Sequence, residues 1–256
     1  NLCNSSKESL RRIEVLTNKK IEFVHGDIRD QDYLIKTMSH YQPDVVIHFA
    51  GLKAVGESTI NPLLYYDVNA RGSINLLNAM NSSGCNQIVF SSSATVYGGQ
   101  GRAPFKEIDE KKPISPYGRT KLQFEHILKD WMNSDSRYRA IALRYFNPLG
   151  AHQSGVIGEY PSGIPNNLMP FIMQVAQGQS KNLLVFGNDY PTRDGTGERD
   201  YIHVVDLAKG HVRALEKINN LKFFQAYNLG TGRGTTVLEL VKAFEECTGL
   251  YIPIQL

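Results

Sequence analysis

Short apolar runs alternate with helical stripes through the first part of the chain. Residues 44–51 form the clearest run, and its lack of polar alternation is typical of a strand buried on both faces of a parallel sheet. Similar runs predict strands at residues 21–25, 87–91 and 140–146. Helices are predicted after Asp30, Pro62 and Ser115, which are residues that cap or begin helices. This βαβα order predicts a doubly wound α/β fold with a parallel, Rossmann-like sheet.

The helical stripes also predict which side chains are buried. Apolar residues recur at helical spacing in three groups, which are Leu34, Ile35 and Met38; Leu76, Leu77 and Met80; and Leu122, Ile127, Leu128 and Trp131.

The alternation breaks after Gly150. Glycines and prolines crowd residues 151–165, and so long an irregular stretch is more often a binding loop than a spacer. A helix at 166–177, a strand at 183–186 and a polar loop at 187–199 follow. The α/β pattern then resumes with a helix at 205–218 and a strand at 226–229, and residues 254–256 resemble a strand. We therefore predict a sheet domain at 1–149 plus 204–230 and a smaller lobe at 150–203 plus 231–256.

Composition narrows the class of protein. The 256 residues are 41% hydrophobic and 21% charged, as in ordinary globular proteins, and the net charge of +3 is too small to indicate nucleic-acid binding. No apolar stretch is long enough for a transmembrane helix, and the first residues do not resemble a signal peptide. The three cysteines are scattered, which indicates free thiols without a metal site and a cytoplasmic location.

Small and hydroxyl-bearing residues follow the predicted strands, where ligands sit in an open parallel sheet. The segments are 26–28, 49–51, 91–93 and 145–147. Any one of them is typical of an ordinary turn, but the four together favour a ligand cleft.

Tyr117 and Lys121 stand four residues apart at the start of a predicted helix, on one face. A nearby ammonium lowers the pKa of a phenol, so the pair could provide a base near neutral pH. The pattern is weak alone, but Ser93 at the end of the preceding strand could meet the phenol over one substrate atom.

With these residues in place, the chain resembles the short-chain dehydrogenase/reductase superfamily, and within it the UDP-galactose 4-epimerases. The resemblance extends from end to end through six segments, namely residues 48–57, 90–98, 115–121, 143–148, 164–170 and 199–204.

The resemblance implies an isomerase of galactose metabolism that interconverts UDP-galactose and UDP-glucose. C4 would be oxidised to a 4-keto intermediate with NAD as cofactor, and then reduced on the opposite face. The catalytic residues would be Ser93, Tyr117 and Lys121. NAD would be bound by Asp27, Ile28, Phe49, Ala50, Gly51, Lys53, Asn69, Lys121 and Tyr145. The UDP-hexose would be held by Ser93, Tyr117, Asn147, Asn167, Leu168, Phe186, Arg199 and Tyr201. The sheet domain would then be the NAD-binding domain, the lobe would bind the UDP-sugar, and a homodimer is expected.

Two other features have simpler interpretations. His48, His203 and His211 show no metal-ligand spacing and are interpreted as core or supporting histidines. Residues 230–234 are rich in glycine but lack the lysine of a phosphate-binding loop, so we interpret them as a turn.

The chain also departs from the family pattern. The first strand, its glycine-rich turn and the following helix are missing, and the family continues beyond residue 256. We therefore expect this chain alone to fold poorly and to bind NAD weakly. Two alternatives stay open: a truncated, non-catalytic relative or fragment, and a nucleotide-sugar 4,6-dehydratase, against which the absence of a carboxylate at residues 93–95 speaks.

Overall fold

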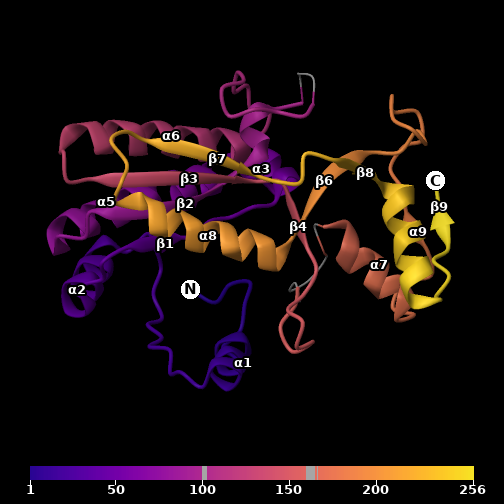
Figure 1. Cartoon of the computed structure of the whole chain (residues 1–256), viewed down its shortest axis with the longest axis horizontal. Coiled ribbons are helices and arrows are strands. Elements are labelled where there is room, and N and C mark those ends of the chain that lie inside the picture. Colours follow the sequence, from indigo (N-terminus) through magenta and orange to yellow (C-terminus); the bar gives the residue numbers. More distant parts are fainter. Residues whose placement is uncertain (100–102, 160–164, 166) are drawn as a thin grey trace. The chain divides into compact units, whose positions relative to one another are not determined.

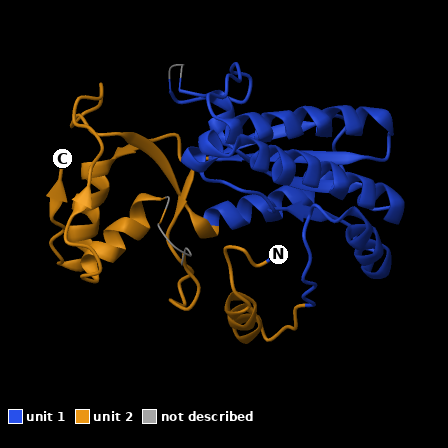
Figure 2. Ribbon diagram, turned by 180° about the vertical axis from the view of Figure 1, so that it is seen from behind, with its two compact units in different colours: residues 1, 22–145, 206–229 blue, residues 2–21, 146–205, 230–256 orange. Residues whose placement is uncertain are grey.

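The computed structural model describes residues 1–99, 103–159, 165 and 167–256, and it divides into two compact units (Figures 1 and 2). The first unit comprises Asn1, Glu22–Tyr145 and Asp206–Leu229, and the second comprises Leu2–Ile21, Phe146–Val205 and Gly230–Leu256. Ile164 and Asn166 of one predicted motif, together with Pro161 and Gly163, lie outside the described residues. The assignment of NAD and UDP-sugar binding to separate domains stays a prediction.

The first unit is built on a four-stranded sheet in the order β1-β2-β3-β7. These strands are Val46–His48, Gln87–Ser93, Arg139–Tyr145 and Gln225–Leu229, and every pair is parallel. All four therefore end at the same edge of the sheet, which confirms the predicted parallel α/β fold.

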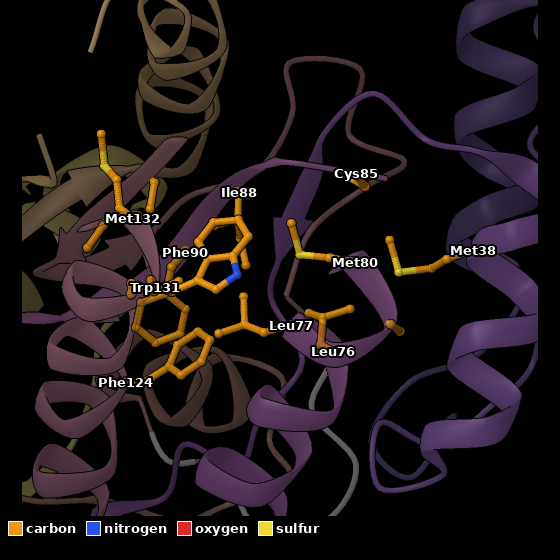
Figure 3. Close-up of a cluster of buried hydrophobic side chains, with 14 residues drawn as sticks. Met38, Leu76, Leu77, Met80, Cys85, Ile88, Phe90, Phe124, Trp131 and Met132 are labelled. Carbon is orange, nitrogen blue, oxygen red and sulfur yellow. The ribbon is translucent and has the colours of Figure 1, made fainter. Parts of the chain in front are cut away.

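Helices cover both faces of this sheet. On one face the main core joins β2 and β3 to α2 (Gln31–Tyr41), α5 (Gly72–Ser83) and α6 (Pro116–Ser134). Figure 3 shows part of this core, with Ile88 and Phe90 of β2 among side chains of the helices. On the other face, Val89 packs in a cluster with Ala214 and Ile218 of α8 (Val204–Ile218). Because neighbouring residues of a strand point to opposite faces, β2 separates the two clusters, as a doubly wound sheet requires.

The helix starts follow the predicted caps. The Asp30 carboxylate accepts a hydrogen bond from the Tyr33 amide at 3.0 Å, and the Ser115 hydroxyl accepts one from the Gly118 amide at 3.1 Å. Pro62 occupies the first turn of α4 (Pro62–Tyr65), which follows α3 (Val55–Ile60) and passes through a π-helical segment, Tyr66–Arg71, into α5.

Two strand predictions are wrong in detail. Residues 21–25 form no strand. The run at 44–51 gives only the three-residue β1, where Ile47 is 37% exposed, so this strand is not buried on both faces. Within the described sheet β1 pairs only with β2, and an edge strand has neither a second ladder nor full cover.

The stripe predicted for α6 was partly wrong. Leu128 and Trp131 are buried, but Leu122 and Ile127 are only partly so. Phe124 and Glu125 are buried instead, because this helix packs a polar residue against the sheet as well as an apolar one.

The second unit contains two small sheets. One has the order β4-β6-β8, formed by Asn147–Leu149, Glu198–His203 and Gly234–Thr236, and the other pairs β5 (Leu183–Leu184) with β9 (Ile254–Gln255). Its core lies between α7 (Leu168–Ala176), α9 (Val237–Thr248) and these strands. A further helix, α1 (Glu8–Thr17), has no buried residue. Among the described residues, no helix is long and apolar enough to cross a membrane.

Candidate active site

The carboxyl ends of β1, β2 and β3 carry five of the eleven residues predicted for the first unit. Ser93 pairs in register with Tyr145, and His48, the last residue of β1, pairs with Phe90. Phe49, Ala50 and Gly51 follow β1 directly, and all three are exposed. The strand ends thus place a hydroxyl, a phenol and an open stretch of backbone at one edge of the sheet.

The Tyr117 phenol and the Ser93 hydroxyl are neighbours at this edge, and Ser93 acts on the phenol as a hydrogen-bonding group that lowers its pKa. Tyr117 is the second residue of α6, so the cap at Ser115 fixes where its side chain emerges. Both side chains are buried, and burial raises the pKa of Tyr117 while the hydrogen bond with Ser93 lowers it. The predicted meeting of the strand-end hydroxyl and the helix-start phenol is present.

Lys121 is buried one helical turn after Tyr117. Its Nζ donates a hydrogen bond to the Ser91 carbonyl at 2.7 Å and lies 5.8 Å from the centre of the Tyr117 ring. Burial lowers the pKa of Lys121 to about 8, because a buried ammonium loses its hydration. In this structure, burial and Ser93 account for the pKa shift of Tyr117, so an effect of Lys121 on that pKa stays a prediction.

Asn69 holds the loop that follows β1. Its Oδ1 accepts from the Leu52 amide at 2.8 Å, and its Nδ2 donates to the Leu52 carbonyl at 2.9 Å and to the Thr120 hydroxyl at 3.2 Å. A Cβ at Gly51 would lie 3.1 Å from Oδ1 of Asn69 and 3.8 Å from Nζ of Lys121. The loop is therefore clamped to α6, with its glycine facing the amide and the ammonium.

Asp27 and Ile28 lie beside the start of α2. The Asp27 carboxylate accepts hydrogen bonds from the Arg29 guanidinium and amide, and from the Asn1 side chain at 2.6 Å. These partners, Arg29 above all, hold the pKa of Asp27 well below its usual range. Ile28 packs against the main core. The remaining predicted residue of this unit, Lys53, is exposed.

In the second unit the structure brings together only some of the residues predicted for the UDP-sugar. Asn147 of β4 pairs with Tyr201 of β6, and Arg199 lies two residues before Tyr201 on the same face of its strand. Burial raises the pKa of Tyr201, while the Arg199 charge lowers it. Asn167 donates to the Glu159 carboxylate at 2.7 Å, Leu168 begins α7, and Phe186 is 84% exposed. Within the described residues, none of these three forms a hydrogen bond or ion pair with Arg199.

The family follows from comparison with known proteins. Residues 2–230 match the model of the NAD dependent epimerase/dehydratase family. The chain belongs to this family.

Members of the family resemble the chain over its whole length. A UDP-glucose 4-epimerase of Erwinia amylovora is 52% identical over 260 residues, which cover 100% of this chain and 76% of that protein. A crystal structure of UDP-glucose-4-epimerase from Stenotrophomonas maltophila, with bound NAD and formylated UDP-arabinopyranose, is 49% identical. Its TM-score is 0.95, and the match covers 99% of this chain and 76% of that one. The Bifidobacterium longum enzyme in complex with NAD+ and UDP has 48% identity, covers 98% of this chain and 75% of that one, and has a TM-score of 0.94.

The residues present fit the cofactor that names the family. Gly51 lacks a side chain where one would fill the space in front of Asn69 and Lys121, so a ligand can approach the backbone there. Lys121 and Asn69 supply polar groups for a ribose, while the exposed Phe49 ring supplies an apolar surface. Among the described residues no cluster of acidic, histidine and cysteine side chains could hold a metal ion.

The histidines, the cysteines and the glycine-rich turn can be described by their immediate surroundings. His48 is buried, with Nε2 2.9 Å from the Ser73 hydroxyl, and His211 is buried against β3, whereas His203 is exposed. The Cys85 and Cys247 side chains are free thiols. At residues 230–234, the Asp200 carboxylate accepts hydrogen bonds from the Thr231 and Gly232 amides, as in a tight turn.

A buried polar network beside Ser93 and Tyr145 was not predicted from the sequence. The Ser92 hydroxyl donates to the Glu125 carboxylate at 2.5 Å, and Arg144 binds both Glu125 and the Tyr97 hydroxyl. Ser92 and Arg144 are the sequence neighbours of Ser93 and Tyr145, and Glu125 lies one turn beyond Lys121. Arg144 inside an apolar strand was the available signal, because a buried arginine needs a partner.

Proposed function

We propose that this protein interconverts UDP-galactose and UDP-glucose by NAD-dependent inversion at C4 of the hexose. The observation that carries the proposal is the buried pair of Tyr117 and Ser93, side by side at the carboxyl edge of the sheet with Lys121 one turn away. Its support is that relatives with about half of their residues identical are UDP-glucose 4-epimerases, one of them in complex with NAD+ and UDP.

Tyr117 is the proposed base. Its phenolate takes the proton of the C4 hydroxyl and becomes the phenol, and Ser93 orients both Tyr117 and the C4 oxygen. The buried ammonium of Lys121 favours the phenolate form that accepts this proton. Since the sugar is reduced again on its opposite face, the same phenol returns the proton in the second half of the reaction.

The proposed cofactor site lies along the carboxyl ends of β1 and β3. Asp27 and Ile28 would contact the adenosine end, and Phe49, Ala50, Gly51, Lys53 and Asn69 the remainder, with Lys121 and Tyr145 near the nicotinamide. NAD, when bound, accepts the C4 hydride and returns it. The clamp of Asn69 on Leu52 holds the backbone of this loop in place before any ligand arrives.

The proposed nucleotide-sugar site uses residues of the second unit. Arg199 offers a guanidinium, which pairs well with a diphosphate, and Asn147 and Tyr201 lie on the paired strands beside it. Asn167, Leu168 and Phe186 complete the proposed set.

The two alternatives have less support. A 4,6-dehydratase needs an acid beside the strand-end hydroxyl. Beside Ser93 lies Thr95 instead, whose hydroxyl oxygen is 3.0 Å from that of Ser93. A non-catalytic relative would not need the buried Ser93, Tyr117 and Lys121 together. The relatives described above are epimerases, which favours the catalytic interpretation.

A homodimer and a cytoplasmic location also belong to the proposal. α3 and α4 expose apolar side chains, with Ile60 78% and Leu63 82% exposed, and such a surface suits pairing with a second copy. The free thiols of Cys85 and Cys247 suit a reducing compartment.

The test is conversion of UDP-galactose to UDP-glucose by the purified protein with NAD. The proposal predicts turnover that needs Tyr117, with net conversion in both directions and no net change in NAD. Absence of conversion by a folded protein that binds NAD would sink it, and formation of a 4-keto-6-deoxy sugar would favour the dehydratase.

A further inference from the structure

Tyr145 and His211 are joined by a short hydrogen bond. The Tyr145 hydroxyl lies 2.5 Å from Nε2 of His211, and Nδ1 of the same imidazole lies 2.9 Å from the Leu207 carbonyl oxygen. His211 is buried in α8, one turn after Leu207, and Tyr145 is the last residue of β3. The imidazole therefore connects a helix backbone to a strand-end phenol that the proposed function places near the nicotinamide.

The direction of each proton follows from these partners. A carbonyl oxygen can only accept, so Nδ1 of His211 carries hydrogen and donates to Leu207. Burial lowers the pKa of His211, which keeps the imidazole neutral and leaves Nε2 as an acceptor. Tyr145 must then donate its hydroxyl proton to His211. Burial also raises the pKa of Tyr145, so this phenol stays protonated.

Phe49 contacts the same imidazole from another strand end. The centres of the Phe49 and His211 rings are 5.0 Å apart at an angle of 42°. Phe49 is 59% exposed, so its ring has little other cover. One histidine thus supports two residues of the proposed cofactor site, after β1 and at the end of β3.

We propose that His211 is a positioning residue of the NAD site: it directs the Tyr145 hydroxyl toward α8 and supports the Phe49 ring, which together set the surface offered to the cofactor. The two strand-edge phenols then have different tasks. Tyr117 lies beside Ser93 and is available for proton transfer, whereas the hydroxyl of Tyr145 is hydrogen-bonded to His211. The inference rests on the proposed function only in taking NAD as the ligand.

The experiment measures NAD affinity by titration for His211→Met, His211→Gln, Tyr145→Phe and the His211→Met/Tyr145→Phe double variant. Removing the acceptor is expected to weaken NAD binding about tenfold, as expected for losing a buried hydrogen bond. Glutamine keeps an acceptor and is expected to restore most of the affinity. The double variant is expected to bind no worse than the weaker single variant, because both substitutions break one interaction. His126→Gln, an exposed histidine of α6, is the control and should bind as the wild type does.

A second measurement does not depend on any variant folding. Nitrogen NMR of the wild-type imidazoles should show His211 protonated at Nδ1 and not at Nε2. Protonation at Nε2, or losses that add up in the double variant, would overturn the inference. Failure of the proposed function would give a different result, because the wild-type protein would then bind NAD but would not epimerise the sugar.

Discussion

Arg144 and Glu125 form a two-pronged ion pair in the interior of the first unit. Nη2 of Arg144 lies 2.6 Å from Oε2 of Glu125, Nε lies 2.9 Å from Oε1, and the two side chains are 4% and 3% exposed. The pair ties β3 to α6, the helix that begins with Tyr117. Ser92 and Tyr97 satisfy the remaining polar atoms, so this network holds the strand ends and the catalytic helix in one arrangement.

Glu125→Gln is expected to lower the free energy of unfolding by about 3 kcal/mol or more. The substitution leaves the buried Arg144 guanidinium without its counter-charge, which costs far more than loss of an exposed pair. Urea unfolding measures the change. The exposed pair of Arg213 and Glu216 supplies the control, because Arg213→Ala should leave the free energy of unfolding almost unchanged. If both variants lost the same free energy of unfolding, the buried pair would stabilise the fold no more than the exposed pair does.

Tyr117→Phe is expected to lower kcat by roughly a hundredfold to ten-thousandfold, because the proposed base is removed while the ring stays. The rate of conversion of UDP-galactose to UDP-glucose measures kcat, and NAD titration checks that the cofactor still binds. Tyr251→Phe, at an 80% exposed tyrosine, should keep full activity. A Tyr117→Phe variant with near-normal kcat would contradict the assignment of the base.

Lys121 is expected to make stability rise with pH in the alkaline range. Its pKa is about 8 in the folded chain against an ordinary value of 10.5, so between these values the unfolded chain binds a proton that the folded chain does not. The cost of the buried ammonium is complete below about pH 8 and vanishes above pH 10.5. Lys121→Met removes this contribution.

The expected result is a gain in stability of Lys121→Met over the wild type near pH 8 that shrinks by up to about 3 kcal/mol as the pH reaches 10.5. Urea unfolding of both proteins without NAD across this range measures it. Lys129→Met, at an exposed lysine of α6, should show no such trend relative to the wild type. A constant difference between Lys121→Met and the wild type would exclude the shifted pKa.

Arg199→Ala is expected to weaken UDP binding by roughly tenfold to a hundredfold, since hydrogen bonds to a charged group are the stronger kind. NAD affinity should stay within about twofold, because Arg199 is not among the residues proposed for the cofactor. Calorimetric titration with UDP and with NAD separates the two effects. Arg213→Ala again serves as the control, and an equal loss of NAD affinity in Arg199→Ala would argue against a role confined to the nucleotide-sugar.

The sequence predicted the structure correctly where the residues that determine it are close together in the chain. The caps at Asp30 and Ser115, the apolar runs of β2 and β3 and the four-residue spacing of Tyr117 and Lys121 are all readable from neighbouring residues. Capping bonds form within one turn and strand burial follows composition, so these features need no knowledge of distant segments.

The sequence pattern predicted burial wrongly where residues from distant parts of the chain determine which side chains are covered. Residues 44–51 read as a buried strand, but the described sheet leaves β1 with one paired side and an exposed Ile47. Phe124 and Glu125 are both buried on α6, although only one of them is apolar, because Arg144 on β3 neutralises the carboxylate.

The sequence by itself determined the α/β class, the strands β2, β3 and β7 and the identity of the residues at the strand ends. It did so because periodicity, caps and short motifs are properties of adjacent residues. Only the tertiary structure decided that Tyr117 lies beside Ser93, that Tyr145 is hydrogen-bonded to His211 and that Arg144 forms an ion pair with Glu125. Each of these contacts joins residues that are far apart in the chain, and their geometry depends on how parallel strands and covering helices pack together.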